Sequence, residues 1–333
     1  MTDVAALVAA LGGMDQKQQL VARGATDRDL TNAVKCGAAL RARNGWYSTL
    51  ADTSAAFRAV RVGGRLTGMS ALVELGAWAY GNFPLHVSVP RNAARQRSPW
   101  SRRIASTRLS RQGVVLHWDD DDVVSRGTPT SVAVEDALLQ AIIDEPLEVV
   151  VAALDWAFKS NTIDRIDFEQ LMLRVPAWAR GIRRFVDDNC DSLPESVVRT
   201  RLLSRGWRVQ SQVRVGDFEE IDLVVEDCVA IEVDGDKFHR DRFEADRRKD
   251  LKITLQELHA LRLSYHMVFD LWPSVLEAIE LVLAAHGISA PVENSGNTVS
   301  RPPPRRPKAK DRRAPGQLSP QVPEFSTEAD VGR

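Results

Sequence analysis

The sequence predicts a multidomain protein of mixed α/β and α+β class. Its 333 residues exceed what one hydrophobic core of about 100–200 residues usually serves. A composition of 44% hydrophobic and 27% charged residues is typical of folded proteins. Stretches of helical periodicity alternate with short runs of period two, which indicate strands. We expect four parts, over residues 1–52, 53–189, 190–290 and 291–333.

The overall composition excludes several kinds of protein. The net charge of −1 confines any nucleic-acid surface to local clusters of Lys and Arg. Three cysteines without a CxxC spacing argue against a zinc ribbon or a disulfide framework and indicate reduced thiols. No apolar run approaches the roughly 18 residues of a membrane span, and the first residues lack a basic secretory segment. We therefore expect a cytoplasmic protein without a membrane partner.

Residues 1–52 read as three short helices followed by a β-hairpin. Asn44-Gly45 separates two β-prone runs and predicts a type I′ turn, which needs positive φ at both residues. Three small helices followed by a two-stranded wing is the order of a winged helix-turn-helix. The helices are expected over Asp3–Leu11, Gln16–Val21 and Thr26–Cys36.

In a winged helix the third helix carries basic and polar side chains to DNA. Here these are Arg28, Asn32 and Lys35, and the wing adds Arg41 and Arg43. The alternative is that the charged residues form a solvated helix face and that the hairpin only closes a small core.

Residues 53–189 should form a mixed α+β middle domain. His86 and His117 each lie in an expected strand, and Asp119–Asp122 follow the second strand. These ligand types would suit a His/Asp metal cluster, although a run of aspartates after a strand is more often a solvated loop. The expected strands are Leu85–Val89 and Val114–Trp118, and the expected helices are Ala55–Val62, Ser70–Leu75, Ser131–Ile143, Leu147–Lys159 and Asp164–Leu173.

Two adjacent runs of period two carry the chemistry of residues 190–290. The runs are Ile221–Val225 and Val229–Asp234, and their apolar sets belong on one face of a sheet. That requirement places Ile221 opposite Val233, Leu223 opposite Ile231 and Val225 opposite Val229. Asp222 then lies opposite Glu232 with Asp234 beside them, so that three carboxylates converge. Residues 226–228 should form the connecting loop.

Three converging carboxylates repel one another unless a cation lies between them. Mg²⁺ or Mn²⁺ would satisfy Asp222, Glu232 and Asp234 and would activate water for attack on a phosphodiester. The alternative is an acidic, solvent-exposed sheet face, which is common in antiparallel sheets.

A helix dense in charge follows Gly235 and holds or approaches Lys237, His239 and Lys249. Periodicity alone makes most of it a solvated face. The order of motifs is more informative. An Asp on one strand, then I-E-V-D-G, a histidine four residues on, a D-x-x-[RK]-D helix and a strand with Leu-Arg resembles the Vsr-like branch of the PD-(D/E)XK endonucleases.

That resemblance covers about a hundred residues and implies a restriction-endonuclease-like αβββαβα domain that cleaves DNA with Mg²⁺ or Mn²⁺. It matches Asp222 and Glu232 to the acidic metal ligands. Asp234 stands where the superfamily usually has lysine, so Lys237, His239 or Lys249 would have to supply that function. The Vsr-like families also tend to have similar residues at four further positions, which in this sequence are Gln212, His239, Asp246 and Arg262.

Glu195 has two interpretations. The superfamily often places an acid of its first helix near the metal, and Glu195 matches that position. Yet Ser192-Leu193-Pro194-Glu195 is also a capping-box pattern, in which Glu195 only stabilises the helix start. Arg199, one turn later, could pair with Glu195.

The amino-terminal half resembles AbiEi-type antitoxins of type IV toxin–antitoxin systems. The motifs are the winged helix, G-G-R-L-T-G-M-S-A-L, H-V-S-V-P and T-P-T-S. This resemblance implies DNA binding and a cognate toxin or defence-system partner. The primary hypothesis is therefore a metal-dependent endonuclease delivered to DNA by a winged helix. Its rival is a non-catalytic DNA-binding regulator or antitoxin.

Residues 291–333 should be a disordered tail. Six prolines lie between Pro302 and Pro320, and residues 301–313 hold seven basic residues against one acidic residue. Such a tail would add salt-sensitive attraction to phosphate or would only increase solubility.

Overall fold

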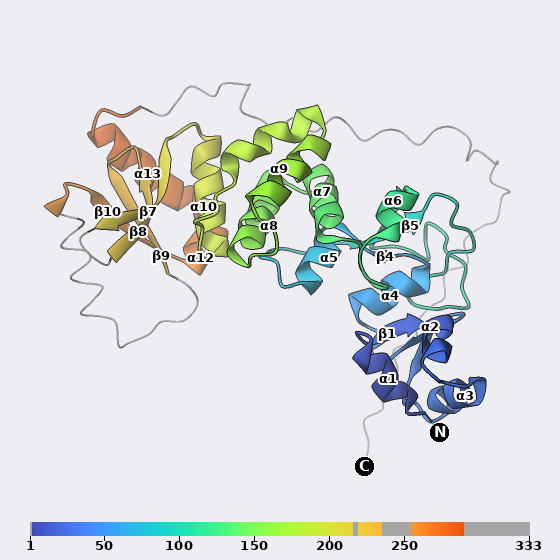
Figure 1. Ribbon diagram of the computed structural model, residues 1–333. Helices are drawn as coiled ribbons and strands as arrows, with labels where there is room; N and C mark the ends of the chain where they lie inside the picture. The colour runs from blue at the N-terminus through green and yellow to red at the C-terminus, as the bar shows by residue number, and fades with distance from the viewer. Residues whose placement is uncertain (1, 216–218, 235–252, 254, 290–333) are drawn as a thin grey trace, which may run out of the picture. The chain divides into compact units, whose positions relative to one another are not determined.

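The computed structural model describes residues 2–215, 219–234, 253 and 255–289. Within these ranges the protein is mixed α/β, as the sequence predicts, and contains three small sheets (Figure 1). Their strand orders are β1-β3-β2, β4-β5-β6 and β10-β9-β8-β7. The sequence predictions for the charged helix after Gly235 and for the tail lie outside the described residues.

The amino-terminal region contains the three predicted helices and the hairpin, together with a strand that was not predicted. Thr26 and Asp29 form a reciprocal capping box at the start of the third helix. Small apolar residues from all three helices close a core against Tyr47. The elements are α1 (Val4–Ala10), β1 (Met14–Gln16), α2 (Lys17–Ala22), α3 (Asp27–Lys35), β2 (Leu40–Arg43) and β3 (Trp46–Ser48).

The hairpin turn lies at Asn44-Gly45, but the predicted type I′ geometry is wrong. Gly45 has φ +78°, whereas Asn44 is not among the residues with positive φ. A register shift between Arg41 and Arg43 shows where β2 bulges against β3. Because a bulge adds right-handed twist, the strands do not depend on a primed turn for their twist.

The middle region packs its helices and a three-stranded sheet around one large core. β4 pairs antiparallel with β5, and β5 pairs parallel with β6. The predicted helices and strands are present with small shifts at their ends. The elements are α4 (Ala55–Val62), β4 (Arg65–Leu66), α5 (Gly68–Glu74), β5 (Leu85–Pro90), β6 (Val114–Asp119), α6 (Asp121–Ser125), α7 (Val134–Asp144), α8 (Leu147–Lys159), α9 (Arg165–Arg174) and the 3₁₀ segment η1 (Ala177–Phe185).

The aspartate run is not a loop. Asp119 ends β6, Asp120 caps a short helix, and Asp121 and Asp122 fill its first turn. Carboxylates are favourable there because the helix amino terminus carries a partial positive charge.

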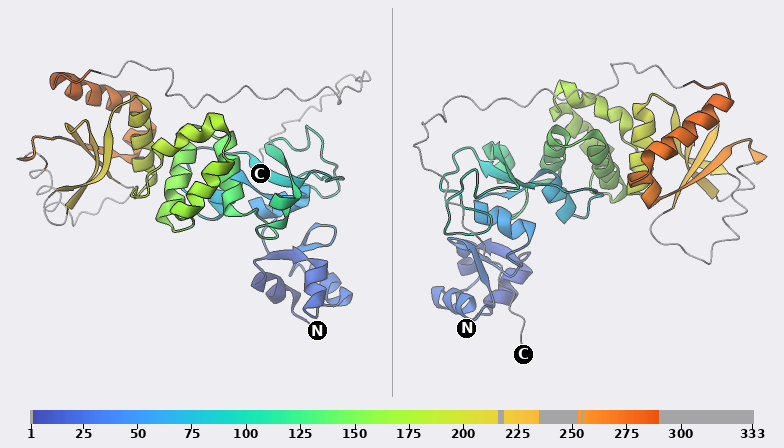
Figure 2. Two further views of the ribbon diagram at one scale, coloured as in Figure 1. Left: turned by 45° about the horizontal axis from the view of Figure 1, so that its top comes forward. Right: turned by 180° about the vertical axis from the view of Figure 1, so that it is seen from behind.

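The carboxy-terminal region covers one face of its sheet with three helices, which share a core with the inward side chains of β8, β9 and β10. Figure 2 shows α13 running along this sheet. β7, β8 and β9 are antiparallel neighbours, and β10 lies parallel to β9. The elements are α10 (Leu193–Ser204), β7 (Val209–Val215), β8 (Glu219–Val225), β9 (Val229–Asp234), β10 (His259–Ser264), α12 (Tyr265–Phe269) and α13 (Trp272–Ala285).

Candidate functional site

The β8–β9 hairpin follows the predicted register over its closed end. Leu223 pairs with Ile231 and Val225 with Val229. Residues 226–228 make the turn, where Glu226 and Asp227 both adopt positive φ. The register prediction is therefore confirmed for these pairs.

The ladder ends at the Leu223–Ile231 pair, so the predicted pairings of Asp222 with Glu232 and of Ile221 with Val233 are wrong. Ile221 packs with Val224 and Ala230, away from the cluster that holds Leu223 and Val225. The cause is a distortion at Asp222. The pairing of β8 with β7 also omits Asp222, opposite Gln212, which adopts a φ of +50°.

Asp222 uses its side chain where the ladder is interrupted. Its Oδ2 accepts a hydrogen bond of 2.7 Å from the backbone N–H of Val233. This bond directs the Asp222 carboxylate towards β9. The residue that it binds, Val233, follows Glu232 in the sequence. Glu232 is only 8% exposed, and it pairs by register with Arg262 of β10. Asp234 is the last residue of β9, and its side chain is not among those that the structure describes.

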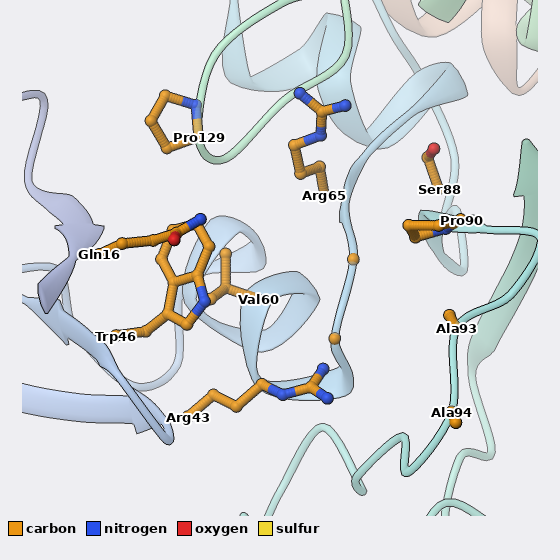
Figure 3. Close-up of a pocket in the computed structure, with 12 residues that line it drawn as sticks. Gln16, Arg43, Trp46, Val60, Arg65, Ser88, Pro90, Ala93, Ala94 and Pro129 are labelled. Carbon is orange, nitrogen blue, oxygen red and sulfur yellow. The ribbon is translucent and has the colours of Figure 1, made fainter. Parts of the chain in front are cut away.

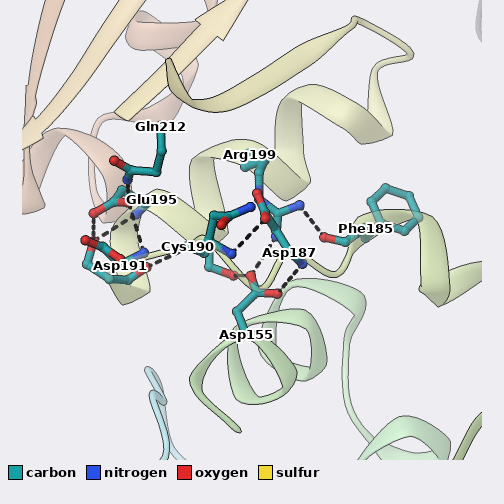
Figure 4. Close-up of polar contacts among 11 residues, drawn as sticks. Asp155, Phe185, Asp187, Cys190, Asp191, Glu195, Arg199 and Gln212 are labelled. Carbon is teal, nitrogen blue, oxygen red and sulfur yellow. Dashed lines mark hydrogen bonds and ion pairs between the residues drawn. The ribbon is translucent and has the colours of Figure 1, made fainter. Parts of the chain in front are cut away.

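Glu195 joins this group from α10. Its carboxylate accepts hydrogen bonds from Ser192 Oγ (2.6 Å), Asp191 N (3.2 Å) and Gln212 Nε2 (3.1 Å), as Figure 4 shows. Burial, assisted by the nearby charge of Asp222, raises the pKa of Glu195 to about 7 against the opposing effect of the Ser192 hydrogen bond.

Both interpretations of Glu195 therefore have support. It organises the start of α10 through Ser192, although it bonds the Ser192 hydroxyl and not the Ser192 N–H of a full capping box. It also lies within electrostatic reach of Asp222. Gln212 Nε2 contacts Glu195, and Gln212 lies between Ser211 and Val213, which pair with the residues on either side of Asp222.

Arg199 does not form the predicted pair with Glu195 but binds Asp155 of α8 (Figure 4). The Arg199 Nη2–Asp155 Oδ2 distance is 2.6 Å, and Asp155 also accepts from Ser196 Oγ at 2.5 Å and Asp187 N at 2.8 Å. Asp155 is fully buried, which raises its pKa to about 6 against the charge of Arg199. Glu195 and Arg199 are one turn apart on α10, but Arg199 is bound to Asp155 whereas Glu195 is bound to Ser192 and Gln212.

The remaining predicted catalytic residues, Lys237, His239 and Lys249, lie outside the described residues. The oxygen donors of Glu195, Asp222 and Glu232 come from α10, β8 and β9. Carboxylate oxygens are the ligands that a hard divalent cation prefers, but among the described residues these three do not form a group whose ligand atoms all lie within 4.8 Å of one another.

The predicted DNA-contact residues of α3 are all exposed. Arg28, Asn32 and Lys35 are spaced by four and three residues, so they share one face of the helix. The two wing arginines are different, because each is held by an intramolecular contact. Arg41 Nη2 donates to Tyr47 Oη at 2.7 Å, and Arg43 Nη1 donates to the Val62 carbonyl at 3.5 Å.

Arg43 also lines a pocket of about 560 Å³ together with Trp46 and Arg65 (Figure 3). Burial lowers the pKa of both arginines, and the charge of Arg97 adds to this for Arg43. Arg43 is therefore directed towards the middle region and away from the exposed face of α3.

A second cluster of ligand-type side chains lies in the middle region. His86 of β5 and His117 of β6 are stacked at an interplanar angle of 12°, and His86 Nδ1 lies 3.1 Å from His117 Nε2. Asp144 Oδ2, at the end of α7, is 3.5 Å from each of these nitrogens. The sequence placed both histidines in strands but expected Asp119–Asp122 as their partners.

That expected set is wrong for Asp119, which accepts a hydrogen bond from Ser88 Oγ. The partner that sequence reasoning missed is Asp144, 27 positions beyond His117. The sequence did contain a signal for Asp144. Asp144-Glu145 places two acids at the negative end of a helix, where carboxylates are unfavourable without a cationic or hydrogen-bonding partner.

In the described part of the chain, no helix combines the length and hydropathy needed to cross a membrane. Comparison of the chain with protein-family models and with curated protein sequences gives no match.

Proposed function

We propose that this protein is a divalent-metal-dependent endonuclease that hydrolyses DNA phosphodiester bonds at Glu195, Asp222 and Glu232. One observation carries the proposal. The Asp222 carboxylate is bonded to the backbone of β9 next to Glu232, and its charge contributes to the raised pKa of a third carboxyl group, Glu195. Neighbouring acids of this kind would suit a cation bound among them, although in the described residues they do not form a group whose ligand atoms all lie within 4.8 Å of one another.

Asp222 and Glu232 would hold Mg²⁺ or Mn²⁺, with Asp234 as a further oxygen donor. Such an ion supplies an acidified water and stabilises charge on the scissile phosphate. Glu195, whose pKa is about 7, exchanges a proton near neutral pH, as a general base requires. Gln212 Nε2 orients its carboxylate from β7. Arg262 lies opposite Glu232 in the pairing of β10 with β9 and is a positively charged residue of the neighbouring strand.

The strand order β10-β9-β8-β7 with α10 before it and α12 and α13 after it supports a restriction-endonuclease-like arrangement. The element order of residues 1–52 supports a winged helix that would deliver the nuclease to DNA through Arg28, Asn32 and Lys35 on the exposed face of α3.

The second candidate is a non-catalytic DNA-binding regulator or antitoxin with a toxin or defence-system partner. The observation that favours it is the acidic Asp234 at the end of β9, where the superfamily that this region resembles usually has lysine. Both candidates share the DNA-binding region, so only catalysis separates them.

The test is cleavage of supercoiled, linear and mismatched DNA by the purified full chain with Mg²⁺, Mn²⁺ or EDTA. Asp222→Asn and Glu232→Gln should each lower the cleavage rate by about 1,000-fold, because removing a key electrostatic group typically costs about 10²–10³. DNA affinity should be unchanged or higher, since neutralising a carboxylate relieves its repulsion of phosphate.

Glu220→Gln is the matched control, because Glu220 is a carboxylate of the same strand that contacts Arg214 at the surface. It should cleave like the wild type. Wild-type protein that binds DNA but shows no divalent-dependent cleavage would support the regulator. Cleavage undiminished in Glu232→Gln would place the active site elsewhere.

A further inference from the structure

We propose that the middle region binds a zinc-class divalent transition-metal ion through His86 Nδ1, His117 Nε2 and Asp144 Oδ2. This site is separate from the nuclease proposal and does not depend on it. Its three side chains come from β5, β6 and α7, which lie far apart in the sequence. Their ligand atoms all lie within 4.8 Å of one another.

The spacing of these atoms matches one face of a tetrahedral coordination sphere. Zn–N bonds of about 2.0–2.1 Å place tetrahedral ligands about 3.3–3.4 Å apart. The distances here are 3.1 Å between the two nitrogens and 3.5 Å from each nitrogen to Asp144 Oδ2. An ion at zinc bond length from all three atoms fits just outside their plane, as in a tetrahedral site.

The protonation states required for metal binding are compatible with the contacts. At 3.1 Å, His86 Nδ1 and His117 Nε2 cannot both carry a proton, so at least one already offers a lone pair. The other nitrogen of His86, Nε2, lies 3.3 Å from Glu145 Oε1. This contact does not have hydrogen-bond geometry in the structure, but a carboxylate near the outer nitrogen favours a proton there and leaves the inner nitrogen available to a metal.

The surroundings of the cluster are acidic. Asp144 is the last residue of α7 and Glu145 is its C-cap. Two carboxylates there lie against the partial negative charge of the helix end. The Asp144 oxygen is further fixed by a 2.7 Å hydrogen bond from Gln140 Nε2. Such outer hydrogen bonds orient first-sphere ligands in metal sites.

Gly68, at the start of α5, leaves room beside the histidines. It adopts a φ of +52°, and a Cβ atom at this position would lie 3.4 Å from His86 Nδ1. Because His86 is 97% buried, with 3% of its surface exposed, the ion would be enclosed and would act structurally. It would fix α7 to the paired strands β5 and β6.

The experiment uses the full chain, purified and treated with chelator, and Zn²⁺ and Co²⁺ as probes. Zn²⁺ affinity is measured by competition with a chromogenic chelator, and Co²⁺ geometry is read from its visible absorption. All proteins also carry Asp222→Asn, which removes the proposed nuclease site from the titration. We expect one tight Zn²⁺ per chain and an absorption typical of tetrahedral Co²⁺.

His117→Gln and Asp144→Asn should each weaken Zn²⁺ binding by about 100-fold or more, and Glu145→Gln by about 10–100-fold, the range usual for outer partners of metal ligands. His266→Gln is the matched control. His266 forms a comparable 2.8 Å contact with Asp270 but is exposed on α12, and its loss should leave the affinity unchanged.

Thermal unfolding shows whether each variant is folded and whether Zn²⁺ stabilises it. Zn²⁺ should raise the unfolding temperature of the Asp222→Asn protein and of its His266→Gln derivative but not that of the His117→Gln derivative. A reference protein that binds no Zn²⁺ at micromolar concentration would overturn the proposal. So would equal affinity in a folded His117→Gln variant.

Discussion

The two ligand clusters of this protein differ in the atoms that they present. The group at Glu195, Asp222 and Glu232 offers only carboxylate oxygens, gathered where β8 is distorted. The group at His86, His117 and Asp144 offers two nitrogens and one oxygen, gathered on regular parallel strands and a helix end. Hard, oxygen-preferring ions suit the first group, and zinc-class ions suit the second.

The surroundings of the two groups differ as well. Burial, assisted by the charge of Asp222, raises the pKa of Glu195 to about 7, so a bound cation would favour the charged form of this carboxyl group. In the histidine group, burial lowers the pKa of His117, and the hydrogen bond from Gln140 helps to lower the pKa of Asp144 against the opposing effect of burial. Protein groups thus already satisfy part of the second cluster, whereas the first depends more on an added charge.

The largest effect on the free energy of unfolding should come from breaking the Asp155–Arg199 ion pair, which links the middle region to the carboxy-terminal region. Asp155 lies on α8, which shares a core with α7, and Arg199 extends from the helix that carries Glu195. Asp155→Ala leaves the guanidinium of Arg199 buried without its main partner, which should cost about 3–5 kcal/mol. Urea denaturation measures the loss.

Asp191→Ala is the control for that change. Asp191 pairs with Lys159, so it also connects α8 to the start of α10, but both side chains are about half exposed. Its loss should cost about 0–1 kcal/mol. If the two variants are equally stable, the buried pair does not link the regions.

The second prediction concerns pH and separates the acidic group from the histidine group. The pKa of Glu195 lies at about 7 in the folded protein against 4.5 ordinarily. Its contribution to stability is therefore present below pH 4.5 and is lost as the pH rises through 7. Each pKa unit corresponds to about 1.4 kcal/mol, so the loss approaches about 3 kcal/mol in EDTA.

Denaturation at several pH values, with Glu195→Gln as the comparison, measures this loss. The variant should lose less stability over that pH interval, and saturating Mg²⁺ should reduce the loss in the wild type. A wild-type profile identical to that of Glu195→Gln would show that the pKa of Glu195 is not raised in the folded protein.

The third prediction probes the space beside the histidines. Gly68→Ala forces a side chain into positive φ, at about 1–2 kcal/mol, and places a methyl group 3.4 Å from His86 Nδ1. Gly76→Ala, at the other end of α5, meets the same backbone strain with open space around it. Both should lower stability, but only Gly68→Ala should weaken Zn²⁺ binding in the chelator competition.

The smallest effect should be on DNA affinity. Replacing both Arg28 and Lys35 with Ala should reduce the slope of log affinity against log salt by about 2, since each phosphate contact contributes about 0.9. Arg165→Ala removes an exposed arginine that contacts Asp188 and should leave the slope unchanged. Fluorescence anisotropy with the full chain at several salt concentrations gives the slopes.

Much of the fold could be predicted from local patterns. Helix and strand periodicity identified α4 and α8 to the residue and the closed end of the β8–β9 hairpin in register. The pattern failed at Ile221, because alternation assumes a regular strand and the hydrogen bond from Val233 N to the Asp222 carboxylate breaks that regularity.

The sites were predictable where neighbours in space were neighbours in sequence. Asp222 and Glu232 lie on consecutive strands, and alternation predicted the closed end of that strand pair, but the pairing itself does not reach these two residues. Asp144 meets His86 and His117 only through the packing of α7 on β5 and β6, which no local pattern encodes. The partner of Arg199 was missed for the same reason, since Asp155 is 44 positions away.

The most direct test of the central claim is anomalous diffraction from crystals of the full chain soaked separately in Mn²⁺ and Zn²⁺. We expect a Mn²⁺ peak about 2.0–2.2 Å from one carboxylate oxygen of Asp222 and one of Glu232, the range usual for a small hard cation. A Zn²⁺ peak is expected between His86 and His117. A structure with saturating Mn²⁺ and no peak at Asp222 and Glu232, or with these side chains on opposite faces of the sheet, would contradict the nuclease assignment.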